Sequence, residues 1–365
     1  MPRRALVLAL TVALVACSNE ATSPPRPVLG EPITGLVQDT WTWVDFPDSA
    51  CDDGSPTGIG VSLGSGPDVL VFMEGGGACW NYATCVTYRG QIAAAGPFGQ
   101  PQFDVKKTEL AGSIFDRSVP SNPFKSSSFV YVPYCTGDVH SGSNVVEYTD
   151  PTGAGAPSTY HHVGHENVLA YLKRVAATFP SPGKLVVSGS SAGGFGALVN
   201  YDTFRTYWPT GQLSLVDDSG PPLPGAQVKA QLDTFDPSWK LYQLLDTFCT
   251  ECRTDITKGL TSLARRHPAD RMSLLSWETD TVIPFFFLLS EDAFVSLLLQ
   301  TAHGTINPLA NAKYFLVGGT TATTPLNRHT VLGHPGDFSV DGVGLWQFLD
   351  QQVNDTPGWA SHAAP

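Results

Sequence analysis

The feature that most constrains this 365-residue chain is a β-branched run that ends in a glycine-rich turn. Residues 185–194 read LVVSGSSAGG and contain the pattern Gly-x-Ser-x-Gly around Ser191. Such a pattern presents a nucleophilic serine on a sharp turn from a strand into a helix, and the glycines beside it leave room for the crossing backbone. Because the pattern also occurs in ordinary glycine-rich loops, its context must decide whether Ser191 is a nucleophile.

Candidates for a catalytic acid and base follow the serine, each after a predicted buried strand. The apolar run 272–277 leads to Asp280, and the run 312–317 is followed by His329. The order serine, aspartate, histidine is that of an α/β-hydrolase. We therefore expect His329 to take the proton of Ser191, while Asp280 fixes the tautomer of the ring and stabilises the imidazolium.

Other residues of the same types remain open as alternatives. Asp217 and Asp218 follow an earlier apolar run, so either carboxylate could reach a histidine. Glu278 is a weaker rival and is expected to be a solvated loop residue. His334 could be the base, although the Pro-Gly pair after it favours a turn.

A glycine-rich loop lies upstream of the serine. Residues 69–73 predict a fully buried strand that runs into Gly75, Gly76 and Gly77. A triple glycine alone is more typical of a flexible turn. With a nucleophile turn downstream, we expect the backbone N–H groups of Gly76 or Gly77 and of Ala192 to form an oxyanion hole.

Five motifs together make the chain more specific than a general hydrolase. They are EGGGACWN at 74–81, VPYCTGDVHSG at 132–142, SGSSAGGFGA at 188–197, DDSG at 217–220 and RHT at 328–330. In this order, over roughly residues 40–352, they resemble the pectin acetylesterase and Notum family of serine carboxylesterases, and most closely its bacterial branch.

The resemblance implies the same roles as the motifs do. It implies Ser191 as nucleophile, Asp280 as acid, His329 as base, and the Gly75–Gly77 loop with Ala192 as oxyanion hole. Plant members are similar enzymes that remove acetyl groups from pectin, and the animal member removes a palmitoleoyl group from a signalling protein. The resemblance therefore implies ester hydrolysis and leaves the acyl chain and the alcohol open.

Three further residues are candidates for contact with substrate. Asp138 and His140 follow the predicted strand at 128–133, so they belong to the same edge of the sheet as the nucleophile and could support the site or touch the substrate. Trp80 follows the glycine loop directly and is the third candidate.

Histidines elsewhere could suggest a metal. His161, His162, His165 and Glu166 stand at the start of a predicted helix, but at no recognised metalloenzyme spacing. We therefore expect neither a metal nor an organic cofactor.

The N-terminus predicts export. Two arginines precede the apolar run 5–15, which is too short to cross a bilayer, and residues 14–17 read LVAC, the pattern of a bacterial lipoprotein cleavage site. Cys17 would then be lipidated, and 1–17 would be the signal peptide; a plain secretory signal cut near Ala16 is the alternative. Residues 18–39 are expected to be a disordered tether that leaves the protein membrane-anchored, periplasmic or at the cell surface.

Six cysteines remain if Cys17 is lipidated, and an even number in an exported chain favours disulfides. Of the fifteen possible connectivities, proximity favours Cys79 with Cys85 and Cys249 with Cys252, which leaves Cys51 with Cys135.

Alternating elements predict one catalytic domain over 40–365. Predicted strands at 69–73, 128–133, 184–188, 213–216, 272–277 and 312–317 alternate with helical patterns such as 166–178 and 194–204. This order predicts an α/β-hydrolase-like fold, with a mostly parallel sheet and helices on both faces. The formal charge of -12 argues against a nucleic-acid partner.

The expected function is hydrolysis of a carboxylic ester, with an acylated small molecule or polysaccharide as substrate and a pectin-type acetyl ester as the first choice. A lipase-like esterase for fatty acyl or polyester substrates is the alternative within the same chemistry. A surface glycan-binding lipoprotein without turnover is the alternative from another class. The sequence leaves the oligomeric state open.

Overall fold

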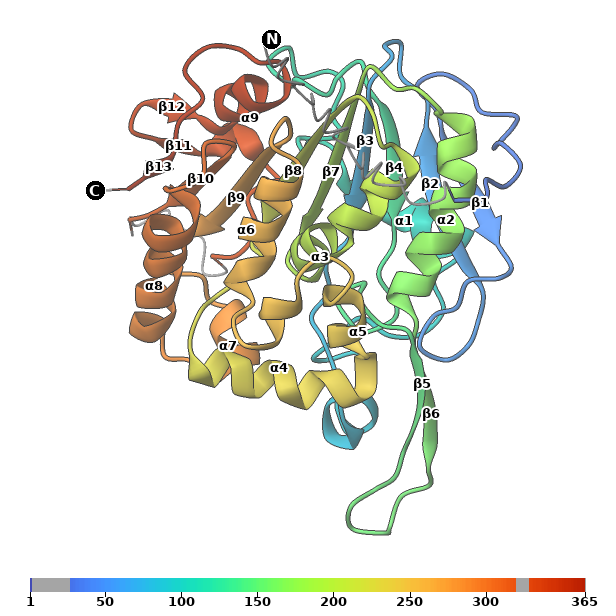
Figure 1. Ribbon diagram of the computed structural model, residues 1–365. Coiled ribbons are helices and arrows are strands. Elements are labelled where there is room, and N and C mark those ends of the chain that lie inside the picture. The colour runs from blue at the N-terminus through green and yellow to red at the C-terminus, as the bar shows by residue number, and fades with distance from the viewer. Residues whose placement is uncertain (2–26, 320–327, 365) are drawn as a thin grey trace.

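A central sheet organises the chain. The computed structural model describes Met1, residues 27–319 and residues 328–364 (Figure 1). Within these residues, nine strands form one sheet in the order β1-β2-β4-β3-β7-β8-β9-β10-β13. The first three strands in this order pair antiparallel, and every later pair is parallel. The strands are β1 (Trp41–Phe46), β2 (Thr57–Ser62), β3 (Val69–Met73), β4 (Ser128–Val132), β7 (Lys184–Ser190), β8 (Gln212–Asp218), β9 (Arg271–Trp277), β10 (Ala312–Val317) and β13 (His362–Ala363).

Helices cover both faces of this sheet. They are α1 (Gln100–Lys106), α2 (Gly164–Thr178), α3 (Ala192–Tyr207), α4 (Ala226–Trp239), α5 (Leu241–Leu245), α6 (Thr257–Arg266), α7 (Ile283–Phe287), α8 (Glu291–Gln300) and α9 (Leu345–Val353). Alternate residues of β3 point to opposite sides: Val69 and Val71 pack with α2, α3 and α6, whereas Leu70 and Phe72 pack with α1 and α9. Because both faces are buried, the parallel strands are continuous apolar runs.

The predicted α/β-hydrolase-like fold is confirmed. All six predicted strands and both predicted helices occur, with bounds that differ by at most three residues from the predicted ones. Strands β1 and β2 were not predicted. Glycines interrupt the pattern of β2, and a Cβ at Gly58 would lie only 2.1 Å from the carbonyl oxygen of Val44. Glycine in a strand weakens its sequence signal and permits this close approach.

Two smaller sheets complete the architecture. Strands β5 (Asn144–Tyr148) and β6 (Ser158–His162) form a hairpin that projects from the body of the molecule (Figure 1). The Asn144 amide donates to the carbonyl of Ser238 at 3.0 Å and holds the hairpin base against the end of α4. Strands β11 (Ser339–Val340) and β12 (Val343–Gly344) form the other pair.

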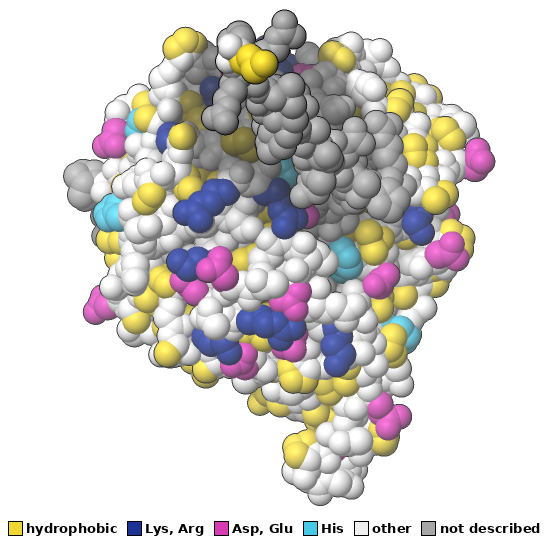
Figure 2. All heavy atoms as spheres, viewed as in Figure 1, with side chains coloured by type: hydrophobic (Ala, Val, Ile, Leu, Met, Phe, Trp, Pro, Cys, Tyr) yellow, Lys and Arg dark blue, Asp and Glu magenta, His cyan; other side chains and the backbone are white. Residues whose placement is uncertain are grey.

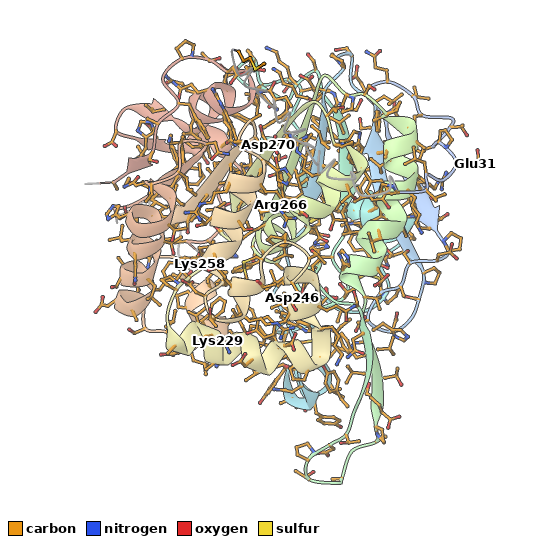
Figure 3. All side chains as sticks on the ribbon, in the orientation of Figure 1. Glu31, Lys229, Asp246, Lys258, Arg266 and Asp270 are labelled. Atoms are coloured by element: carbon orange, nitrogen blue, oxygen red, sulfur yellow. A yellow bond between two sulfur atoms is a disulfide. The ribbon has the colours of Figure 1, made fainter. Side chains whose placement is uncertain are left out.

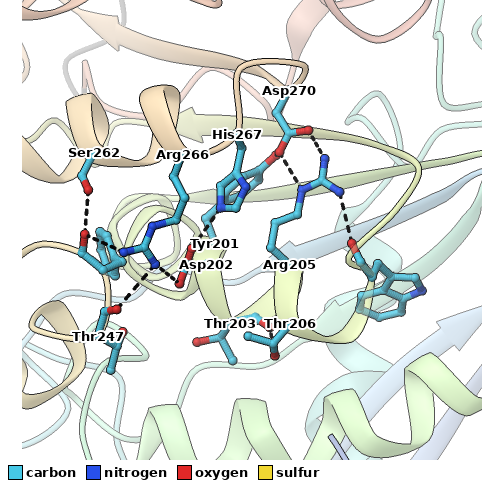
Figure 4. A network of polar contacts seen from close by, with 12 residues as sticks. Tyr201, Asp202, Thr203, Arg205, Thr206, Thr247, Ser262, Arg266, His267 and Asp270 are labelled. Carbon is cyan, nitrogen blue, oxygen red and sulfur yellow. Dashed lines mark hydrogen bonds and ion pairs between the residues drawn. The ribbon is translucent and has the colours of Figure 1, made fainter. Parts of the chain in front are cut away.

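A polar network fastens α3 to α6 and to the start of β9 (Figure 4). The guanidinium of Arg205 pairs with the buried carboxylate of Asp270, which also accepts a hydrogen bond from Tyr201 at 2.9 Å. Asp202 pairs with Arg266 at 2.8 Å and with His267 at 2.9 Å. These contacts fix the helix that follows Ser191 at its far end, away from the turn.

The N-terminal segment departs from its prediction. The predicted signal peptide, Cys17 and residues 18–26 of the predicted tether lie outside the described residues. The remainder of that tether is packed on the domain, because Ile33 is buried and its N–H donates to Thr178 at 2.8 Å. The N–H of Gly30 donates to Lys173 at 3.0 Å. Leu36 also packs against the core, so apolar contacts and hydrogen bonds hold a segment whose composition is typical of a linker.

The surface carries charges of both signs. On the face in Figure 2, basic and acidic side chains are intermingled and neither sign dominates. Within the described residues, no helix is both long and apolar enough to cross a membrane.

Candidate active site

Ser191 occupies a strained turn between β7 and α3. Its φ of +59° is unfavourable for a residue with a side chain, and such strain is characteristic of a nucleophile turn. Glycine is required on both sides. A Cβ at Gly189 would lie 2.2 Å from the carbonyl oxygen of Gly193, and one at Gly193 would lie 1.9 Å from that of Met73. The local sequence therefore fits the close crossing of strand and helix.

His329 and Asp280 form a hydrogen-bonded pair. His329 Nδ1 lies 2.7 Å from Asp280 Oδ2. The other oxygen of Asp280 accepts the backbone N–H groups of Val282 at 2.7 Å and Ile283 at 2.9 Å, so the carboxylate is held in place. His329 Nε2 is buried and has no hydrogen-bond partner among the described residues. His329 and Ser191 line the same cleft, and this nitrogen can act there as a base.

Asp217 and Asp218, the alternative acids, have other partners. Asp218 accepts hydrogen bonds from Ser190 at 2.6 Å and from the N–H groups of Val331 and Leu332 at 3.0 Å. Burial raises the pKa of Asp218, and these hydrogen bonds oppose the rise. Asp218 thus anchors the segment just after His329. Asp217 is buried and accepts from the N–H of Gly220 at 2.9 Å.

The remaining alternatives also lie outside the cleft. Glu278 is half-buried, and its side chain accepts a hydrogen bond from the backbone of Ala364, the residue after the edge strand β13. His334 is exposed and immediately precedes the short 3-10 helix Pro335–Asp337, as expected for a turn residue.

The glycine loop after β3 abuts the nucleophile. A Cβ at Gly75 would lie 2.8 Å from Ser191 Cβ, and Gly77 has a φ of +81° that favours glycine. The carbonyls of Gly76 and Gly77 are engaged elsewhere, by the N–H of Ala94 at 2.6 Å and the hydroxyl of Tyr134 at 2.9 Å. Ala192 is the first residue of α3, where a backbone N–H has no partner within the helix. This arrangement brings together the predicted oxyanion donors.

Asp138 and His140 support that loop from inside the protein. His140 Nε2 donates to the carbonyl of Glu74 at 2.8 Å, and burial lowers the pKa of His140 to about 4, which keeps the ring neutral. Asp138 accepts from Thr136 at 2.7 Å and from the N–H of Gly164 at 2.7 Å. Burial raises the pKa of Asp138 to about 6. Of the two roles predicted for these residues, support agrees with their burial and contact with substrate does not.

Trp80, the third candidate for substrate contact, packs against Phe235 with ring centroids 4.7 Å apart. Its backbone carbonyl accepts from Ser238 at 2.8 Å. Phe235 lines an apolar cavity beside Ser191, so Trp80 forms part of the packing behind that cavity.

The disulfides pair as sequence proximity favours. The described residues contain Cys51–Cys135, Cys79–Cys85 and Cys249–Cys252. The second joins the end of the glycine loop to the π-helical turn Tyr82–Thr87, and Trp239 Nε1 donates to the carbonyl of Cys79 at 2.8 Å. This disulfide restrains the segment that carries the predicted oxyanion donors Gly76 and Gly77. The set as a whole fits a protein that folds in an oxidising compartment.

One cluster within the described residues has metal-ligand composition: Cys79, Cys85 and His162. Its two sulfurs are joined in a disulfide and are not thiolates. His162 donates through Nδ1 to Thr136 at 2.9 Å and accepts at Nε2 from Tyr148 at 2.8 Å. The histidine is therefore used structurally, at the base of the β5–β6 hairpin.

Two cavities meet at Ser191. One, of about 710 Å³ including space open to solvent, is lined almost wholly by apolar side chains from α3, α4 and α7, among them Phe195, Leu232, Phe235 and Phe286. The other is a cleft of about 1000 Å³, also partly open, which is lined by the glycine loop, by His329, by charged side chains such as Glu74 and by apolar side chains such as Phe115. Ser191 therefore lies between an apolar cavity and a cleft that contains charged side chains.

Comparison with known families places the chain among them. A model of the pectinacetylesterase family matches residues 40–263, which is more than half of the chain. The chain belongs to the pectinacetylesterase family. The matched span includes Ser191 and the glycine loop, whereas Asp280 and His329 lie beyond it.

Curated relatives of this pectinacetylesterase-family chain are distant. It is 28% identical over 218 residues to the palmitoleoyl-protein carboxylesterase NOTUM of Drosophila melanogaster, covering 55% of this chain and 31% of that protein. It is 27% identical over 178 residues to the human protein of the same name, covering 47% and 34%. Pectin acetylesterase 11 of Arabidopsis thaliana is 26% identical over 180 residues, covering 47% and 42%. The alignments thus span less than half of each relative.

Proposed function

We propose that this protein hydrolyses carboxylic esters through Ser191, His329 and Asp280. One observation carries the proposal: His329 is bound through Nδ1 to Asp280 and has an unpartnered Nε2 in the cleft that Ser191 also lines. A neutral imidazole that donates from Nδ1 has its lone pair on Nε2, which is where the hydroxyl proton of Ser191 must go.

The reaction proceeds through an acyl-enzyme. Ser191 Oγ attacks the ester carbonyl while His329 Nε2 takes its proton, and the oxyanion is stabilised by N–H groups of the glycine loop and Ala192. The alcohol leaves with the proton from His329. Water then attacks the acyl-enzyme, with His329 as base again, and releases the acid.

Turnover of an activated ester tests the chemistry. Purified protein is expected to hydrolyse p-nitrophenyl acetate, and Ser191→Ala is expected to lose at least about a thousandfold in kcat. The matched control is Ser181→Ala, in an exposed loop, which should keep wild-type activity. Equal turnover by Ser191→Ala and wild type would refute the proposal.

The substrate class has two candidates. Family membership, with a relative named pectin acetylesterase, supports acetyl esters of carbohydrates. The apolar cavity supports longer acyl chains, since an acetyl group would contact only the few side chains nearest Ser191. We also propose that the chain is exported and, through Cys17, lipid-anchored.

Acyl preference decides between the candidates. We expect Phe286→Ala, which removes a ring lining the apolar cavity, to lower kcat/KM for p-nitrophenyl octanoate about tenfold and for the acetate less than twofold. Tyr88→Ala is the matched control, because that ring is 49% exposed and does not line the cavity. If wild type prefers the acetate and Phe286→Ala affects both esters equally, the longer-chain candidate is refuted.

A further inference from the structure

The cleft beside Ser191 contains charged side chains that the proposed reaction does not use. Among its described lining residues these are Glu74, Lys106 and Glu109. The ammonium of Lys106 lies 3.1 Å from Glu74 Oε1 and 3.0 Å from Glu109 Oε2. One cation is therefore shared by two carboxylates, and the group has a net negative formal charge.

Glu74 pairs with Lys106 on the side of the cleft that faces the protein interior. Its side chain is 15% exposed, and its second oxygen accepts the N–H of Tyr134 at 3.2 Å. Burial raises the pKa of Glu74, and Lys106 is the first of the groups that oppose this rise. Because a half-buried carboxylate is disfavoured when its cation leaves, the pairing with Glu74 opposes a turn of Lys106 towards a ligand.

The outer side of the cleft adds no compensating cation among the described residues. The side chain of Glu109 is 59% exposed at the rim. Arg328, the nearest arginine in sequence to His329, donates to the carbonyl of Thr279 at 3.0 Å and faces Glu291 at 3.4 Å. Asp280 contributes a further carboxylate behind the imidazole of His329.

We propose that this cleft selects esters of neutral or cationic alcohols and discriminates against alcohols that carry a carboxylate, with Lys106 acting as the counter-ion of Glu74. This specificity presupposes the proposed esterase function and, among acetyl esters of carbohydrates, favours uncharged glycans over the galacturonate polymer of pectin. A substrate carboxylate would have to compete with two protein carboxylates for one ammonium and would be repelled by Glu109. Neutral hydroxyl groups, in contrast, can donate hydrogen bonds to Glu109 at the rim.

Three aryl acetates that differ in charge test the proposal. They are 4-acetoxybenzoate, its methyl ester, and 4-(trimethylammonio)phenyl acetate, each rate being divided by the hydroxide-catalysed rate to correct for the leaving group. One unit charge about 6 Å from another in a water-like medium changes kcat/KM by about threefold. At low ionic strength we expect the anionic ester to be the poorest substrate by at least that factor, and the difference to shrink in 0.5 M salt, where the Debye length is only about 4 Å.

Substitutions of the charged residues show which of them cause the discrimination between the esters. Glu109→Gln should raise kcat/KM for the anionic ester, relative to kcat/KM for its neutral methyl ester, by about threefold. Glu31→Gln is the matched control, since Glu31 is exposed beside α2 (Figure 3). Lys106→Gln should lower the melting temperature, and adding Glu74→Gln should restore part of it, because the unpaired buried carboxylate is then removed.

The outcomes separate the two proposals. Wild-type preference for the anionic ester, lost in Lys106→Gln, would overturn the specificity while the esterase function stands. Equal rates for all three esters at low salt would overturn it too. If wild type hydrolyses none of the esters, the proposed function fails and the specificity fails with it.

Discussion

Replacement of Gly75 by alanine probes the contact between the glycine loop and the nucleophile. The added Cβ would lie 2.3 Å from the carbonyl oxygen of Ser190 and 2.8 Å from Ser191 Cβ. Carbon atoms in favourable contact are about 3.5–4.0 Å apart. The loop must therefore move away from Ser191 by roughly 1 Å, and the N–H groups of Gly76 and Gly77 move with it.

A displacement of that size is large for a catalytic geometry. Misplacement by about 1 Å can cost about a hundredfold in rate, which corresponds to about 2.7 kcal/mol in the barrier. We expect Gly75→Ala to lower kcat for p-nitrophenyl acetate by about this factor with a smaller change in KM, because the oxyanion forms only in the transition state.

The control is Gly304→Ala, at a site where an added Cβ meets nothing within 4 Å. Both variants are assayed by stopped-flow or steady-state hydrolysis, with circular dichroism to verify folding. If folded Gly75→Ala keeps kcat within twofold of wild type, the assignment of the loop to the oxyanion hole is refuted.

Three other predictions follow from the site. Asp280→Asn should lower kcat by about 10³–10⁴-fold because the tautomer of the ring is no longer fixed, whereas Asp218→Asn should mainly lower the melting temperature; the reverse pattern would make Asp218 the acid. Removal of either the Cys79–Cys85 or the Cys249–Cys252 disulfide should lower the free energy of unfolding in urea by about 2–3 kcal/mol. Only removal of Cys79–Cys85 should also lower kcat, and equal kcat in the two variants would contradict the restraint on the glycine loop. The pKa of His140 is about 4 in the folded protein, so between about pH 6.5 and pH 4 the ring is protonated in the unfolded chain but not in the folded one. The free energy of unfolding should therefore fall by up to about 3 kcal/mol as pH falls through that range. Thermal melts of His140→Asn should show a shallower pH dependence than those of wild type, and identical slopes would exclude this effect.

The sheet and the turn at Ser191 were predictable because their signals are local. The strands of the parallel region are buried on both faces, so residues such as 69–73 and 312–317 form continuous apolar runs. The turn around Ser191 requires glycine at positions 189 and 193 for steric reasons that the sequence displays directly. The pairing of His329 with Asp280 followed from their order along the chain and their places after successive strands.

Other features depend on contacts that the sequence does not reveal. The sequence indicates Asp218 only as an alternative acid. Its hydrogen bonds to the segment after His329 arise from the tertiary fold. The order of residues 27–39 depends on contacts with α2 that a linker-like composition conceals. The sharing of Lys106 by Glu74 and Glu109 also went unpredicted, since Glu74 lies at the end of β3 and Lys106 at the end of α1.

The most direct test of the proposed chemistry is active-site labelling with a fluorophosphonate, followed by intact mass measurement and peptide mapping. We expect one phosphonyl group per molecule, located on Ser191, with no label on Ser191→Ala and slow labelling of His329→Ala. Ester turnover by a protein in which Ser191 stays unlabelled, or labelling of another residue that abolishes turnover, would contradict it.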